Sequence, residues 1–347
     1  MLPISAADAV SPAIQRTRIF LFRPFRFGTY LKLCLVAVLT EGASGGNFNS
    51  SSFGKHHTSS RHGANLSYVP FAFTPLRIAE FVAMSLLVIL LCFWLYYLIT
   101  RLRFAFFHCL IHNTKEIRPG WRLYREPAAR FFWLNVVVGF CFLLLVALIA
   151  LPFVAGFWGL FQNAGAGGHP SFAAIFALLL PLIPIFLLII LAGFLVDVIL
   201  RDLMLPHYAL ENATAGQAWT AAWARIRAEK GPFFVYALLR LLLPIVAAIG
   251  LFIVLIIPAI IFIVVVAAVA VGIHAVFSGS LAGIFLGVLF GVVVFAVALL
   301  VWISVGGPLS TAVRQYALLF YGGRYQALGD ILWPPPPVAG TNAPRMA

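Results

Sequence analysis

Residues 241–272 read LLLPIVAAIGLFIVLIIPAIIFIVVVAAVAVG and contain no charged side chain. A helix needs about 20 apolar residues to cross the hydrocarbon core of a bilayer, so this run is long enough to span one. The whole chain has the same character, with 63% hydrophobic and 10% charged residues and a mean hydropathy of +1.04. Soluble domains contain about 25% charged residues. The sequence therefore predicts an all-α integral membrane protein, because helices satisfy their own backbone hydrogen bonds in lipid.

Stretches without charge predict six membrane passes. Phe81–Thr100 is one clear example, and turn-rich segments at 162–170 and 272–280 divide two longer runs into pairs of passes. The first pass carries Lys32, and a cleaved signal peptide is the alternative interpretation of this segment. The expected passes lie near residues 25–42, 81–100, 131–157, 172–200, 233–268 and 280–306.

The distribution of positive charge predicts the orientation. Of 23 Lys and Arg residues, the loops 43–79, 158–171 and 269–279 hold only Lys55, Arg61 and Arg77. The positive-inside rule therefore places these loops outside and both termini in the cytoplasm. The net charge of +13 comes from short clusters between apolar runs. We expect them to attract anionic lipid headgroups on the cytoplasmic side, and we expect no nucleic-acid partner.

An internal repeat is predicted at a spacing of 102 residues. Each copy begins with a short Trp/Arg segment and ends at a proline, and five positions match: Trp121, Arg125, Phe131, Phe132 and Pro206 with Trp223, Arg227, Phe233, Phe234 and Pro308. Weaker similarity suggests a third copy at the N-terminus. Because each copy contains an even number of passes, the copies share one orientation and form three parallel hairpin repeats.

The repeat divides the chain into four units. The first (1–112) is an N-terminal interfacial helix and a hairpin with an exported Gly/Ser/His loop at 43–77, and repeats two and three occupy 113–206 and 207–308. The remaining unit, 309–347, is expected to form a cytoplasmic helix and a disordered proline-rich tail.

An amphipathic helix at the membrane surface is expected before each hairpin, near 3–22, 113–127 and 211–229. In the last of these, residues spaced at helical intervals form one apolar stripe that includes two tryptophans. Such helices lie in the headgroup region. The residues expected to face lipid there are Trp121, Arg122, Arg125, Trp219, Trp223, Arg225 and Arg227.

The N-terminal sequence resembles a known family. AIQRTR (13–18), LFRPFRFGTYLKL (21–33) and GGNFN (45–49) resemble a prokaryotic family of uncharacterised multi-pass membrane proteins. WRLYR (121–125) and residues 206–227 are similar to a wider group that contains the membrane domain of some glycerophosphodiester phosphodiesterases. The resemblance implies a prokaryotic inner-membrane protein and supplies no activity, since the chain has no soluble phosphodiesterase domain.

Asp197 and Arg240 are the most informative candidate site, because charged groups inside a pass are costly and are usually paired. Both lie at a similar expected depth, so we predict an interhelical ion pair that fixes packing, with an ion or proton pathway as the functional alternative. Two other pairings remain open. Arg201 lies one turn from Asp197, and Asp202 is a second acceptor for Arg240.

Two further groups are weaker candidates. Glu41 and Glu80 are expected to face one another at the outer surface, either as snorkelling side chains or as a cation-attracting mouth. A cluster of three histidines in the exported loop offers imidazole ligands for Zn²⁺ or Cu²⁺, although a solvated polar loop is the preferred interpretation. These metal candidates are His56, His57 and His62.

The sequence gives no sign of catalysis. Walker A, HExxH, GxSxG and CxxC motifs are all absent, and the four cysteines lie in or beside apolar segments. We therefore expect no enzymatic activity and no cofactor. The prediction is a non-enzymatic accessory or scaffold protein of the inner membrane that organises lipid or a partner complex. The alternatives are a small permease or channel, and a membrane anchor for a separately encoded enzyme.

Overall fold

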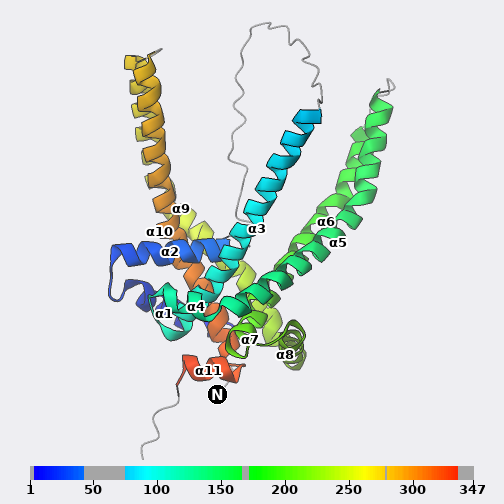
Figure 1. Ribbon diagram of the computed structural model, residues 1–347, viewed down its shortest axis with the longest axis vertical. Coiled ribbons are helices and arrows are strands. Elements are labelled where there is room, and N and C mark those ends of the chain that lie inside the picture. Colours follow the sequence, from blue (N-terminus) through cyan, green and yellow to red (C-terminus); the bar gives the residue numbers. More distant parts are fainter. Residues whose placement is uncertain (1–3, 43–74, 166–171, 278–279, 335–347) are drawn as a thin grey trace, which may run out of the picture.

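The computed structural model describes residues 4–42, 75–165, 172–277 and 280–334, and within these ranges every regular element is a helix. The long helices meet at one end of the molecule, which we call the base, and diverge from it as three arms (Figure 1). One arm is α3, the second is the α5–α6 pair, and the third is the α9–α10 pair.

Five helices are long and apolar enough to cross a membrane, in agreement with the prediction of a multi-pass membrane protein. Their apolar windows are exposed to the surroundings of the chain, as lipid-facing helices should be. The bounds are α3 (Pro75–His112), α5 (Arg125–Gly165), α6 (Phe172–Val198), α9 (Lys230–Phe277) and α10 (Leu281–Gly322). The path of α6 continues at the base through η2 (Ile199–Met204) and α7 (Leu205–Leu210).

The expected first pass, residues 25–42, is not among the five candidate spans of the described residues, and six passes stay a prediction. This segment forms α2 (Phe27–Gly42), whose 16 residues extend for about 24 Å, less than the roughly 30 Å of hydrocarbon. Helix α2 lies across α10 at the base (Figure 1). One face of α2, with Leu33, Cys34, Val36 and Ala37, is buried against protein, and a Cβ on Gly307 of α10 would lie only 2.3 Å from the Cβ of Cys34.

Short helices surround the base. Three of them fall where interfacial helices were expected: α1 (Val10–Phe22), α4 (Ile117–Leu123) and α8 (Ala215–Ala228). Thr214 begins α8 with a capping box, in which its backbone N–H donates to the side chain of Gln217 at 2.9 Å. The last described helix is α11 (Gln326–Leu332).

The two described ends of the chain meet at the base. Arg324 donates to the carbonyl of Ile4 at 3.1 Å, and Arg16 of α1 donates to the carbonyl of Leu332 at 2.9 Å. Fully buried aromatic side chains fill the space between the helices here, among them Phe104, Tyr208, Tyr236, Tyr316 and Phe320. The protein core therefore lies at the base, and the arms beyond it carry exposed apolar side chains.

Candidate functional site: a buried charge cluster

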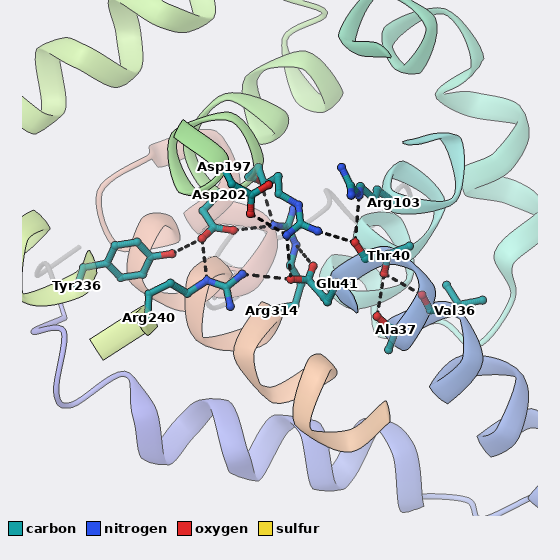
Figure 2. Close-up of polar contacts among 11 residues, drawn as sticks. Val36, Ala37, Thr40, Glu41, Arg103, Asp197, Asp202, Tyr236, Arg240 and Arg314 are labelled. Atoms are coloured by element: carbon teal, nitrogen blue, oxygen red, sulfur yellow. Dashed lines mark hydrogen bonds and ion pairs between the residues drawn. The ribbon is translucent and has the colours of Figure 1, made fainter. Parts of the chain in front are cut away.

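Seven charged side chains gather at the base where the arms converge, and we call them the charge cluster (Figure 2). They are four arginines and three carboxylates from six helical segments. Helix α2 provides Glu41, α3 provides Arg103, and α6 provides Asp197. The π-helical segment η2 provides Arg201 and Asp202, α9 provides Arg240, and α10 provides Arg314.

Asp202 is the most enclosed carboxylate of the charge cluster, with a side chain that is 1% exposed. One oxygen accepts from the Tyr236 hydroxyl at 2.7 Å and from Arg240 Nε at 3.0 Å. The other accepts from Arg314 Nη1 at 2.8 Å. Asp202 therefore joins η2 to both helices of the α9–α10 arm through three hydrogen bonds.

Glu41 ends α2 and attaches that helix to three of the arginines. One carboxylate oxygen lies 3.1 Å from Arg240 Nη2 and 3.8 Å from Arg201 Nη1, and the other lies 3.9 Å from Arg314 Nε. Burial alone would raise the pKa of Glu41, but the surrounding arginines outweigh it and hold the pKa at about 2. The carboxylate is therefore ionised at any physiological pH.

The predicted pair of Asp197 and Arg240 does not form, and both alternative pairings do. Asp197 accepts from Arg201 Nη1 at 2.9 Å, one turn along the same helical path. Arg240 instead binds Asp202 and Glu41. The physical reason is the burial of the two carboxylates. Asp202 is deeply buried beside Arg240, whereas Asp197 keeps 31% of its side chain exposed.

The π-helical segment η2 explains why adjacent residues Arg201 and Asp202 both point inward. A π-helix carries i→i+5 hydrogen bonds and widens the turn, which leaves backbone carbonyls available to side chains. Arg314 Nη1 donates to the free carbonyl of Arg201 at 3.0 Å. Arg201 in turn donates to the carbonyl of Thr40 in α2. The π-helical turn thus lets Arg201 and Asp202, which carry opposite charges, contact α2 and α10.

The predicted facing pair of Glu41 and Glu80 is also wrong. Glu80 is exposed near the start of α3, whereas Glu41 lies in the charge cluster at the base. The expectation failed because α2 lies against α10 at the base, which brings Glu41 to the arginines there and away from the start of α3. The candidates His56, His57 and His62 lie outside the described residues. Within the described ranges, no group of three His, Cys, Asp or Glu residues could hold a metal ion.

A second polar group, centred on His207 of α7, was not predicted. His207 Nδ1 lies 3.0 Å from Glu211, and Nε2 lies 2.8 Å from the Tyr321 hydroxyl and 3.1 Å from Arg225 Nη1. Because a guanidinium only donates, Nε2 accepts and Nδ1 carries the proton given to Glu211. Burial alone would raise the pKa of Glu211, but the hydrogen bond with His207 and the nearby Tyr325 hydroxyl and Arg225 outweigh it and lower the pKa. The i, i+4 spacing of His207 and Glu211 was the available sequence signal.

The expected lipid-facing residues separate into two groups. Trp219 and Trp223 of α8 are exposed and stacked, with ring centroids 5.7 Å apart, and Arg227 lies over the Trp223 ring. Arg122 and Arg125 are exposed as well.

Arg225 and Trp121 differ from that expectation, because both contact protein. The guanidinium of Arg225 packs on the Tyr325 ring at 4.9 Å, and that of Arg101 lies 4.2 Å from the centre of the half-buried Trp121 ring.

The geometry of the charge cluster is that of a structural clamp. The side chains of Thr40, Glu41, Arg103, Arg201 and Arg314 leave no room between them for a water-sized sphere. Buried ion pairs fix the relative positions of elements more reliably than they add stability. The cluster therefore sets how α2, α3, η2, α9 and α10 pack at the base.

Comparison with known proteins identifies a family. Neither a curated protein nor a solved structure matches the chain. The expected similarity to the membrane domain of glycerophosphodiester phosphodiesterases stays a prediction. A family model described as a family of unknown function (DUF7544) matches residues 4–331, which extend from before α1 to the last turn of α11. The chain therefore belongs to this family of unknown function.

Proposed function

We propose that the protein is a non-enzymatic scaffold of a prokaryotic inner membrane, which organises lipid or a partner membrane complex around a rigid base. The observation that carries this proposal is the contrast between base and arms. At the base, six of the seven side chains of the charge cluster form ion pairs with one another, and the gap inside the cluster is too small for water. The arms present long, exposed apolar surfaces and separate from one another (Figure 1).

A permease would need a polar path between its membrane helices. In the described residues, the apolar windows of the five long helices are exposed rather than buried around a channel. The exposed apolar surface of these long helices is instead suited to contact with lipid tails or with the helices of another membrane protein. This favours the scaffold over the permease.

The proposed topology places the base and both termini in the cytoplasm, and the tips of the arms outside. The described chain ends already lie together at the base. Helices α4, α5 and α6 follow the same order as α8, α9 and α10, a short helix followed by a long hairpin. This supports parallel repeats, with α1, α2 and α3 as a third copy in which the first long helix is shortened.

The proposed partner on the cytoplasmic side is anionic lipid. Exposed Trp219 and Trp223 with Arg227 provide aromatic and cationic groups on the outer surface of α8. Tryptophan prefers the membrane interface, and each Lys or Arg near an anionic surface contributes about 1 kcal/mol.

The test is purification in a mild detergent, followed by quantitative identification of the bound proteins and lipids. We expect a stoichiometric membrane-protein partner or a defined lipid set, and a reduced anionic lipid content in the Trp219→Ala/Trp223→Ala variant. Glu80→Gln, which changes an exposed charge outside the base, serves as the matched control. Solute flux in proteoliposomes that is lost in Arg240→Met would contradict the scaffold and favour a permease.

A further inference from the structure

Arg103 differs from the other arginines of the charge cluster because it lacks a carboxylate partner. No Asp or Glu oxygen of the described residues lies within 4.0 Å of its side-chain nitrogens, although all ten acidic residues are described. Its Nε donates to the carbonyl of Thr40 at 3.0 Å, and its Nη2 is buried with no hydrogen-bond partner. Figure 2 shows its guanidinium set apart from the three carboxylates.

This arrangement is unusual on energetic grounds. Arg103 is only 5% exposed, and the carboxylates of Asp197 and Glu41 act on it only from beyond 4.0 Å, so its buried charge is less well compensated than those of the other three arginines. The charge cluster contains four arginines and three carboxylates, so it carries one positive charge in excess. A single monovalent anion beside Arg103 would balance the cluster and satisfy the free Nη2.

The position of Arg103 along α3 indicates where this anion comes from. The charge-free stretch Phe81–Thr100 of α3 spans about 30 Å, which equals the thickness of the hydrocarbon core. Arg103 follows three residues after Thr100, or about 4.5 Å beyond the end of that stretch. This is the level of the lipid headgroups, whichever leaflet the base adjoins.

We propose that Arg103 is the centre of a binding site for a phosphate monoanion, with the phosphodiester of a membrane lipid as its ligand. A lipid phosphodiester carries one negative charge, which equals the excess charge of the cluster. Guanidinium groups bind phosphate through paired, charge-assisted hydrogen bonds. The site deepens the proposed function, since it specifies one lipid contact of the scaffold, but the scaffold does not depend on it.

Binding requires a movement, because the side chains around Arg103 leave no room for water in the unliganded protein. Arg103 is the arginine of the charge cluster best able to move. Within the described residues its side chain makes one hydrogen bond, to the carbonyl of Thr40, whereas the other three arginines also form ion pairs. Rotation about its side-chain bonds would carry the guanidinium toward the headgroup level while its aliphatic stem stays packed, as arginines do at membrane surfaces.

The test is a titration of the delipidated protein in a neutral detergent, with thermal unfolding followed by tryptophan fluorescence. Three probes are added separately: phosphatidylglycerol, inorganic phosphate, and a diacylglycerol that has acyl chains but no phosphate. The variants are Arg103→Met and a matched control, Arg118→Met, which removes an exposed arginine of α4. We expect phosphatidylglycerol to stabilise the wild type and Arg118→Met alike, and Arg103→Met to require at least about tenfold more of it.

Each outcome decides the proposal. An effect of phosphatidylglycerol that depends on Arg103 supports the lipid source, and a similar effect of inorganic phosphate supports the same site with a free anion as ligand. Without ligand, Arg103→Met should be at least as stable as the wild type, because an unpaired buried charge is gone. Lower stability with an unchanged phosphatidylglycerol response would overturn the proposal. If Arg103→Met does not fold, Arg103→Lys should bind phosphatidylglycerol more weakly, and an unchanged response there would overturn it as well. Scaffold activity is scored separately by co-purification.

Discussion

Asp202→Asn tests whether the charge cluster holds the base together. The substitution preserves the shape of the side chain and removes its charge. Arg240 and Arg314, which bind opposite oxygens of Asp202, then lose their shared counter-charge, and the new amide N–H₂ group faces one of them. Breaking a buried ion pair from one side costs about 3–5 kcal/mol, so we expect a loss of that size in the free energy of unfolding.

Asp197→Asn provides the matched control. It removes the same chemical group from the same cluster, but Asp197 is 31% exposed and its arginine partner also has Glu41 at 3.8 Å. Partly exposed pairs contribute about 0–1 kcal/mol, so the two substitutions should differ by at least about 2 kcal/mol.

The measurement is equilibrium unfolding in mixed detergent micelles, followed by tryptophan fluorescence. The double variant Asp202→Asn/Arg240→Met should recover roughly half of the loss, because it removes charges of both signs together. If Asp202→Asn costs no more than Asp197→Asn, the charge cluster does not act as the clamp, and the fold of the base must depend on apolar packing alone.

Three other measurements test separate parts of the structure. Gly307→Ala should destabilise the protein by about 1–3 kcal/mol because α2 has to move away from α10, whereas Gly291→Ala, in open space, should be neutral or stabilising in the same unfolding assay. Glu41, whose pKa is lowered from 4.5 to about 2, contributes stability that is fully present above about pH 4.5 and is lost as the pH falls toward 2. In Glu41→Gln, the melting temperature should therefore change less with pH over this range than in the wild type. An unchanged dependence of the melting temperature on pH would exclude the assignment. In a cysteine-free background, Ser59→Cys should react with an impermeant maleimide in intact cells and Thr220→Cys should not, and the reverse result would invert the proposed topology.

The sequence predicts the long helices well because charge-free length is a local property. The end of the stretch Phe81–Thr100, for example, marks the point where α3 enters the base. The same reasoning did not identify residues 25–42 as a helix that packs against α10. An apolar segment has the same composition whether protein or lipid buries it, and the close approach of Cys34 to Gly307, which holds α2 against α10, is not visible in either segment alone.

The sequence predicted some members of the charge cluster, but it did not predict which of them pair with one another. Asp197 and Arg240 were identified as costly charges, and both lie in the cluster. Their partners depend on the rotation of each helix and on the π-helical turn at Arg201, which no periodicity reveals. Arg314 was missed, although it is the first charge after the apolar run that follows Arg240, so the two arginines flank the α9–α10 hairpin at its base end.

The unequal lengths of the arms have a consequence for the surrounding bilayer. The charge-free part of α3 measures about 30 Å, whereas residues 241–277 of α9 carry no charge over about 55 Å and contain no buried residue. Tilt alone would have to exceed 50° to place the longer stretch within 30 Å of hydrocarbon, beyond the usual range of up to about 40°. Lipids next to the α9–α10 arm therefore have to stretch relative to those beside α3. This hydrophobic mismatch makes the protein a source of a thickness gradient, and it should favour longer acyl chains on one side of the molecule.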